Sequence, residues 1–197
     1  MLPAPTFSLI LHFPDPAGAV HRSQYRAKTL LHNANKRCLV NESTPAKADL
    51  VPFTGEFSGR VTSWIDSEET YCNMTGKQEY PPPENVVASW QRVDIKAYLL
   101  MAHGQPVAYG EIWDRPVELA AEIGHLIVDP AKRGRGYGTK MLNLLSMRAA
   151  HNARVSKVVL NFHEGDETVL GCYLKAGFQL VGRGRGGHGL RMELKVE

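Results

Sequence analysis

The segment that most constrains the fold of this chain spans residues 126–139, where an apolar stretch leads into a basic, glycine-rich loop. Asp129-Pro130 ends the apolar stretch, and three glycines follow, interleaved with basic residues. Residues 138–150 then carry apolar side chains at helical spacing. The segment therefore predicts a strand, a loop and the start of a helix.

A loop of this kind is suited to binding a phosphate or pyrophosphate. The N–H groups at a helix N-terminus carry partial positive charge, and glycine lets a ligand come close to the backbone. The side chains of Lys132, Arg133 and Arg135 would add charge-assisted hydrogen bonds. The Walker A loop and the dinucleotide fingerprint do not fit, because the residue order around Thr139 and Lys140 is wrong for both.

The rest of the pattern predicts a mixed α/β (α+β) sheet with helices packed on it. A hairpin is expected from apolar runs at 96–102 and 106–113, which His103-Gly104 joins. Further strands are predicted at 118–128, 155–162, 178–182 and 190–196, and helices at 138–150 and 167–176. Gly177 is expected to end the second of these helices.

Length, composition and charge limit the classes of function that this chain can have. The chain has 197 residues, which suits one domain with an appendage, and we predict an N-terminal extension at 1–47 and a folded domain at 48–197. The net charge of +3 is too small to argue for nucleic acid, and no apolar run is long enough to span a bilayer. Three scattered cysteines indicate reduced thiols in a cytoplasmic protein and no metal site.

Two motifs in these elements resemble those of a known family. Arg133, Gly136 and Gly138 form Arg-x-x-Gly-x-Gly after Leu-Ile-Val-Asp-Pro, and Tyr173 precedes Gly177-Phe178 as Tyr-x-x-x-Gly-Phe. From about residue 50 to the C-terminus the chain resembles the GNAT superfamily of N-acetyltransferases. The resemblance implies a mostly antiparallel mixed sheet with splayed central strands and flanking helices, and acetyl-CoA as the acetyl donor.

The resemblance also implies which residues bind the cofactor. The backbone of the strand pairs with the pantetheine arm, and one of its N–H groups stabilises the oxyanion. The loop and the helix start wrap the pyrophosphate. Asp166 stands where the family usually has an asparagine; an ionised aspartate cannot donate to the pantetheine carbonyl. The implied cofactor-binding residues are Leu126, Ile127, Val128, Arg133, Gly134, Arg135, Gly136, Tyr137, Gly138, Thr139 and Asp166.

Two side chains are implied as catalytic. Tyr173 matches the general acid that protonates the departing thiolate, and Glu122 matches the glutamate that serves as general base in the histone-acetylating branch. Strand alternation predicts that Glu122 shares a face with Leu126 and Val128 and that His125 lies on the other face as a packed residue. Glu111, or a water molecule, is the reserve candidate for the base.

One departure from the family concerns the base. Asn161 stands where the ribosomal-protein-acetylating branch has its glutamate, and an amide cannot act as a base, which argues against that branch's mechanism.

The sequence thus predicts an acetyl-CoA-dependent transferase that acetylates a primary amine of a small molecule, protein or peptide in a ternary complex. The acceptor cannot be read from the sequence. We expect a monomer or homodimer that binds neither nucleic acid nor membrane. Two alternatives stay open: a catalytically silent CoA-binding regulatory module, and an RNA-associated protein that uses the basic N-terminal stretch and the Arg/Gly loop at 182–188.

Overall fold

The computed structural model describes residues 47–163, 167–184 and 189–196. Residues 1–46 lie outside these ranges, and they make up nearly all of the predicted extension. Asp166 and most of the Arg/Gly loop also lie outside the described residues. No helix in the described ranges is long and apolar enough to cross a membrane.

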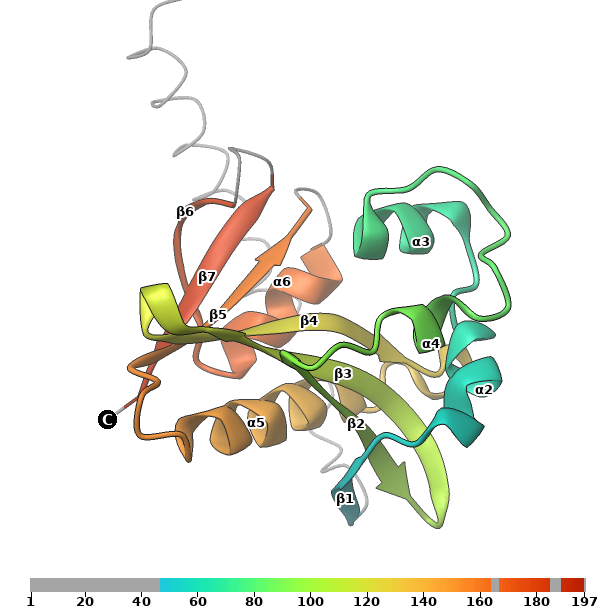
Figure 1. Ribbon diagram of the computed structural model, residues 1–197, viewed down its shortest axis with the longest axis horizontal. Coiled ribbons are helices and arrows are strands. Elements are labelled where there is room, and N and C mark those ends of the chain that lie inside the picture. The colour runs from blue at the N-terminus through green and yellow to red at the C-terminus, as the bar shows by residue number, and fades with distance from the viewer. Residues whose placement is uncertain (1–46, 164–166, 185–188, 197) are drawn as a thin grey trace, which may run out of the picture.

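Seven strands form one mixed sheet in the order β1-β2-β3-β4-β5-β7-β6 (Figure 1). Only the β4–β5 pair is parallel, and every other neighbouring pair is antiparallel. The predicted mixed, mostly antiparallel architecture is therefore confirmed. The strands are β1 (Ala48–Pro52), β2 (Ile95–Ala102), β3 (Gln105–Arg115), β4 (Ala120–Val128), β5 (Lys157–Phe162), β6 (Gln179–Arg183) and β7 (Leu190–Lys195).

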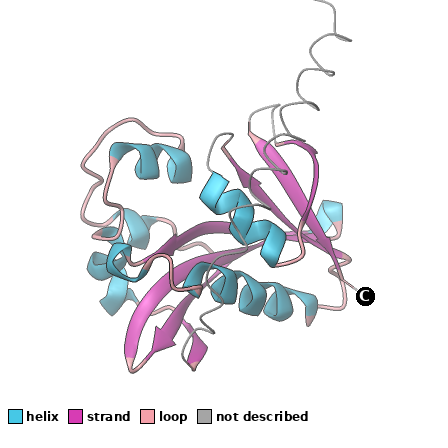
Figure 2. Ribbon diagram, turned by 180° about the vertical axis from the view of Figure 1, so that it is seen from behind, coloured by secondary structure: helices cyan, strands magenta, loops and turns pink. Residues whose placement is uncertain are grey.

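Helices cover both faces of this sheet. The pair α5 (Tyr137–Ala150) and α6 (Glu167–Lys175) lies on one face, as Figure 2 shows from behind. The other face, over β2, β3 and the end of β4, is covered by short helices. They pack a second apolar cluster around Tyr109 and Ile127. These are α2 (Ser58–Thr62), α3 (Glu68–Thr75) and α4 (Val86–Ser89), with one-turn 3₁₀ helices η1 (Gly55–Phe57), η2 (Pro116–Glu118) and η3 (Pro130–Lys132) at loops.

Local signals in the sequence predicted most of these elements within a few residues. The hairpin turn is His103-Gly104, and both residues have positive φ, as the two-residue turn that matches strand twist requires. Ser67 caps α3 by accepting a hydrogen bond from the Thr70 N–H at 3.1 Å, and Gly177, with φ +87°, follows α6. Strand β1 was not predicted from the sequence; among the strands of the described ranges it pairs only with β2.

The predicted splay lies between β4 and β5. Their parallel pairing covers three positions and ends at Glu122 and Val159. Strand β4 continues to Val128 and β5 continues to Phe162, but these later residues do not pair with each other. The two strands diverge in Figure 1. The unpaired edge of β4 therefore presents backbone N–H and C=O groups to which an extended ligand can bond.

Candidate active site

The loop after β4 is built to present N–H groups. The Asp129 carboxylate accepts a hydrogen bond from the Ala131 N–H at 2.9 Å and starts the η3 turn. Gly134 and Gly136 have φ of +74° and +77°, a left-handed conformation that glycine adopts without steric cost. Helix α5 begins directly afterwards, at Tyr137, so the N–H groups of its first turn have no partner within the helix. This geometry is suited to bind an anion.

Three elements meet at Gly138. A Cβ at Gly138 would lie 3.6 Å from Val128 Cγ2 and 3.5 Å from Cys172 Sγ. The Thr139 hydroxyl also lies 3.2 Å from Cys172 Sγ. The end of β4, the start of α5 and the middle of α6 therefore converge, which brings the two sequence motifs together although they lie far apart in the chain.

Arg133 makes a contact that the sequence did not predict. Its guanidinium donates to both oxygens of Asp66, at 2.8 and 3.1 Å, and ties the loop to the segment before α3. The hydrogen bond from Arg133 is the largest cause that holds the pKa of Asp66 below its usual value. The Arg133 side chain is thus engaged with Asp66, and we expect its part in holding pyrophosphate to come from its backbone.

Tyr173, the predicted general acid, lies on α6 and is half-buried. Its ring packs edge-on against Phe162, at the end of β5, with ring centroids 5.3 Å apart. Tyr173 adjoins Cys172, which contacts Thr139 at the start of α5. This places the tyrosine beside the predicted cofactor loop; its role as acid stays a prediction.

Glu122, the predicted base, is buried and has two side-chain partners. Arg115 Nε donates to one carboxylate oxygen at 2.6 Å, and Asn161 Nδ2 donates to the other at 2.9 Å. Asn161, which the sequence marked as a departure from the family, therefore holds Glu122 in place where β4 and β5 separate. Protonation of Glu122 would remove the charge that pairs with Arg115, which disfavours this carboxylate as a proton acceptor.

The prediction about the faces of β4 was wrong. Tyr109 pairs with Ile127 but Glu111 pairs with Gly124, so two residues of β4, His125 and Leu126, stand opposite one residue of β3. This is a β-bulge, and His125 in it has φ of +43°. The extra residue reverses the alternation.

The bulge moves side chains between faces. Leu126 and Val128 pack with the α5 cluster, whereas Glu122 and His125 both lie on the opposite face.

A buried polar cluster surrounds His125. The Glu111 side chain is fully buried, and one of its oxygens accepts hydrogen bonds from Trp113 Nε1 at 2.6 Å and lies 2.9 Å from His125 Nδ1. The other oxygen accepts a short hydrogen bond from the Tyr109 hydroxyl. Burial is the first cause that raises the pKa of Tyr109, followed by the Glu111 charge, so the phenol stays protonated and donates.

Two indoles fix the imidazole ring of His125. Trp90, at the end of α4, stacks on it with centroids 4.0 Å apart, and Trp113 meets it edge-on at 5.1 Å. Sequence reasoning treated His125 as a packed residue, because neither the bulge nor Trp90 can be seen in the local pattern. A histidine at this bulge beside a buried glutamate is the feature that only the structure shows.

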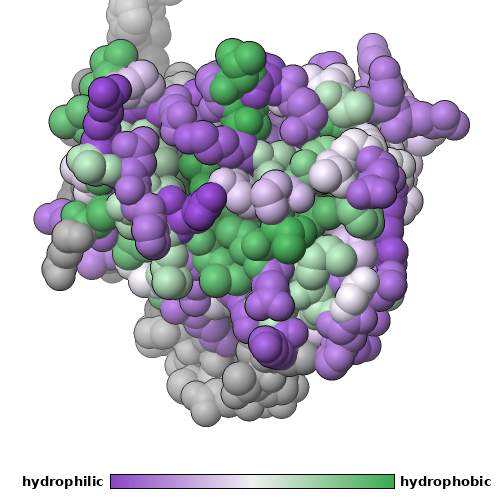
Figure 3. All heavy atoms as spheres, turned by 60° about the horizontal axis from the view of Figure 1, so that its bottom comes forward, coloured by the Kyte–Doolittle hydropathy of each residue, from purple (hydrophilic) through white to green (hydrophobic). Residues whose placement is uncertain are grey.

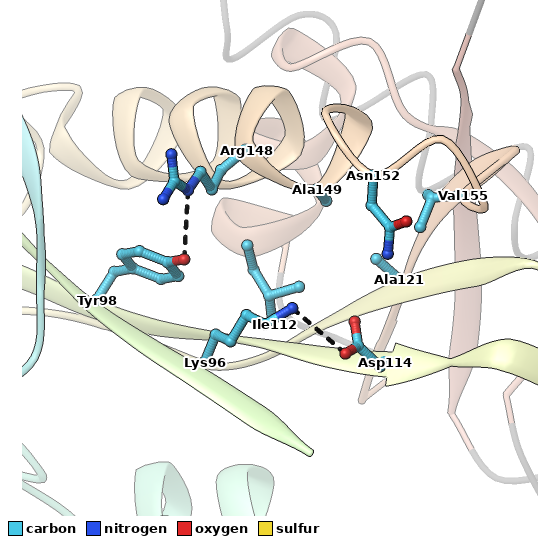
Figure 4. Close-up of a pocket in the computed structure, with 9 residues that line it drawn as sticks. All are labelled: Lys96, Tyr98, Ile112, Asp114, Ala121, Arg148, Ala149, Asn152 and Val155. Carbon is cyan, nitrogen blue, oxygen red and sulfur yellow. Dashed lines mark hydrogen bonds and ion pairs between the residues drawn. The ribbon is translucent and has the colours of Figure 1, made fainter. Parts of the chain in front are cut away.

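Two hollows lie on the face of the sheet that α5 covers. One, of about 160 Å³, is lined by Lys96, Asp114 and Arg148 among others (Figure 4). A second, of about 270 Å³, lies between β1 and α5, beside Leu50 and Met147. Figure 3 brings this side forward and shows apolar surface among polar side chains. Both hollows adjoin the C-terminal half of α5, far from the loop at its N-terminus.

Comparison with known proteins identifies the family. Residues 58–178 match the model of the acetyltransferase (GNAT) family, which is more than half of the chain. The chain therefore belongs to the GNAT acetyltransferase family, and the resemblance drawn from the two motifs is confirmed.

Among curated proteins, the chain is similar to aminoglycoside N(6')-acetyltransferases type 1 from Klebsiella pneumoniae and Serratia marcescens. Each is 23% identical over 133 residues, which cover 62% of this chain and 64% of the relative. The matched region thus spans a little under two thirds of the length of these relatives.

Solved structures share the fold. Aminoglycoside acetyltransferase AAC(6')-Ib in complex with coenzyme A has a TM-score of 0.63 and 18% identity, over 76% of this chain and 95% of that one. Spermidine N-acetyltransferase from Vibrio cholerae, in complex with CoA and spermine, has a TM-score of 0.63 and 12% identity over the same shares. At these identities the likeness shows the fold alone.

Proposed function

We propose that this chain is an acetyl-CoA-dependent N-acetyltransferase that moves the acetyl group to a primary amine by direct transfer within a ternary complex. The observation that carries the proposal is the β4–β5 pairing, which ends at Glu122 just ahead of a positive-φ glycine loop at the start of α5. An open strand edge next to free N–H groups suits a thioester arm that ends in a pyrophosphate.

The cofactor contacts follow from this arrangement. The backbone of Leu126, Ile127 and Val128 bonds the pantetheine arm, and one N–H of this strand stabilises the oxyanion of the tetrahedral intermediate. The pyrophosphate binds the backbone at residues 133–139. Tyr173 protonates the leaving thiolate. This assignment is supported by the convergence of β4, α5 and α6 at Gly138.

The acceptor is an amine whose larger structure we do not assign. Family members with this fold include proteins named for aminoglycosides, for spermidine and for a ribosomal protein N-terminus. The shared chemistry is an amine that must lose a proton before it attacks. A cytoplasmic location and a monomer or homodimer remain part of the proposal, and the free thiols of Cys72 and Cys172 accord with a reducing compartment.

The test has two stages. The full chain is heated with acetyl-CoA, with CoA or with buffer, and thiol release is then followed over a panel of aminoglycosides, polyamines and peptides with free N-termini. Stabilisation by acetyl-CoA together with thiol release on at least one acceptor is expected. A failure of acetyl-CoA to stabilise the chain would refute the proposal. Stabilisation without thiol release on any acceptor would favour the rival, a silent CoA-binding module.

A further inference from the structure

We infer that His125, oriented by the buried Glu111, is the general base that takes the proton from the acceptor amine. The inference rests on the proposed function and deepens it by assigning the proton transfer to residues other than Glu122. It starts from the β4 bulge, which turns the His125 side chain onto the face of the sheet that α2, α3 and α4 cover.

The hydrogen bond to Glu111 decides which nitrogen of His125 can accept a proton. An ionised carboxylate only accepts hydrogen bonds, so Nδ1, 2.9 Å from the Glu111 oxygen, carries the hydrogen. In the neutral imidazole, Nε2 then holds the lone pair. Nε2 makes no hydrogen bond to any residue that the structure describes. The His125 side chain as a whole is largely buried, with 11% of its surface exposed.

The surroundings hold this ring in one orientation. Trp90 and Trp113 fix its plane from two directions, and Gln91 donates to the Tyr109 hydroxyl at 3.0 Å, which in turn donates to Glu111. Hydrogen bonds therefore hold both oxygens of the Glu111 carboxylate. A buried acid is costly unless its oxygens are satisfied, and here three donors satisfy them, one of which is the histidine. This is the arrangement of a histidine base positioned by a carboxylate.

His125 is also in the right place along the chain. It immediately precedes Leu126, the first residue of the strand edge to which the thioester arm is proposed to bond. The bulge lies beyond Glu122, the last β4 residue paired with β5, so His125 stands at the unpaired part of β4. An amine that approaches from the α2–α4 side of the sheet would meet Nε2 before it reaches the thioester.

Glu122 has a different task in this arrangement. Its two oxygens are engaged by Arg115 and Asn161, and it closes the end of the β4–β5 pairing as a structural ion pair. Taking a proton would remove the charge with which Glu122 pairs with Arg115 and weaken that bond. His125 Nε2 has no such bond to lose.

The proton transfer balances without any further reactant. His125 Nε2 takes one proton from the bound ammonium and passes it to solvent. The neutral amine nitrogen then forms a bond to the thioester carbonyl carbon and loses its second proton to Nε2. The C–S bond then breaks, and the thiolate takes a proton from Tyr173. The proton on Nε2 is released to solvent, and Tyr173 regains one from solvent. The sum is an ammonium and acetyl-CoA giving an amide, CoA thiol and one proton.

The charges around the imidazole are few. On β3 it faces the Glu111 carboxylate, with the Tyr109 hydroxyl behind it. On the α4 side it meets the uncharged ring of Trp90. The nearest cation among the contacts described is Arg115, whose guanidinium lies 5.1 Å from the Trp113 ring centre and pairs with Glu122. Glu111 is thus the one carboxylate in direct contact with the imidazole among the described residues.

The decisive variant is His125→Asn. The asparagine amide nitrogen occupies nearly the position of Nδ1 and can still donate to Glu111, and asparagine tolerates positive φ. The variant lacks the basic nitrogen and the ring that Trp90 and Trp113 contact. His103→Asn is a matched control, because His103 also has positive φ, at +50°, but is exposed in the β2–β3 turn. Glu122→Gln tests the rival base in the same assay.

We expect kcat of His125→Asn to fall about 100-fold or more, as loss of a general base typically causes, with the stabilisation by acetyl-CoA unchanged. The rise of kcat/KM with pH should disappear, and added imidazole should restore part of the rate. His103→Asn should match the wild type, and Glu122→Gln should retain that rise. Glu111→Gln should lower kcat and displace the rise without changing KM for acetyl-CoA.

The outcomes separate the two proposals. A wild-type chain that turns over no amine refutes the proposed function itself. Turnover in the wild type with an undiminished rate in His125→Asn refutes only the assignment of His125. The same holds if Glu122→Gln abolishes the pH-dependent rise while His125→Asn retains it, because Glu122 would then be the base.

Discussion

The Gly134→Ala variant tests whether the glycine loop after β4 binds the cofactor, because its effect on stability without ligand can be compared with its effect on stabilisation by acetyl-CoA. Gly134 has φ of +74°, and a Cβ built on it would meet nothing within 4 Å, so the only cost to folding is conformational. An alanine in the left-handed region costs about 1 kcal/mol. For a domain of this size that lowers Tm by roughly 2–4 °C. The loop can relieve the strain by leaving the left-handed conformation, which would turn N–H groups away from the pyrophosphate.

Ligand stabilisation is the quantity that reports this loss. At a concentration of acetyl-CoA about 100 times Kd, the stabilisation of the wild type is about 2.7 kcal/mol. A tenfold rise in Kd reduces it to about 1.4 kcal/mol at the same concentration, so the Tm shift on adding acetyl-CoA should fall by about half. The assay is thermal unfolding of both proteins over a series of acetyl-CoA concentrations.

Gly76→Ala is the matched control. Gly76 has φ of +73°, is equally free of neighbours within 4 Å, and ends α3 away from the loop. Both variants should lose similar stability without ligand, but only Gly134→Ala should lose stabilisation by acetyl-CoA. If the two variants respond equally to acetyl-CoA, the reasoning that this loop binds the pyrophosphate is wrong.

Three further outcomes follow from the structure. Tyr173→Phe should lower kcat about 100-fold with little change in the stabilisation by acetyl-CoA, measured by thiol release and thermal shift; a normal rate would rule out the acid role. Gly124→Ala should cost about 1–3 kcal/mol in denaturant unfolding, because its Cβ would lie 2.6 Å from the Trp113 ring, and a variant as stable as the wild type would contradict that contact. Burial alone would raise the pKa of Glu193, but hydrogen bonds from Lys157 and Arg191 lower it below its usual value of 4.5. Ionised Glu193 therefore stabilises the fold above that pH, and the stability is lost as pH falls below it. Glu193→Gln should cost roughly 1 kcal/mol at neutral pH and flatten this acid dependence; an unchanged pH curve would contradict the ion-pair network.

Much of the fold could be predicted because its signals are local. The β2–β3 turn follows from His103-Gly104, and the stop of α6 follows from Gly177. Strand β1 carries no such signal. It is short, and its pairing with β2 joins residues about fifty positions apart in the chain.

In the candidate site, too, local features could be predicted from the sequence, whereas contacts between distant elements could not. The glycine loop could be predicted because an anion site at a helix N-terminus depends on neighbouring residues. The partner of Arg133 could not, because Asp66 lies on another element and only packing brings the two together. Likewise, Glu122 matched a catalytic position by sequence, but Arg115 and Asn161 engage it only after the strands have paired.

The sequence by itself determined that this chain has a strand, a glycine loop and a helix start that suit a CoA pyrophosphate. Those features depend on backbone conformations that neighbouring residues specify. Only the tertiary structure decided which side chains lie on the face of the sheet that α2, α3 and α4 cover. A bulge arises from the register between β3 and β4, and one extra residue at His125 turns every later side chain of β4 to the opposite face. For this reason Leu126 and Val128 pack with the α5 cluster, while His125 lies beside Glu111 on the other face.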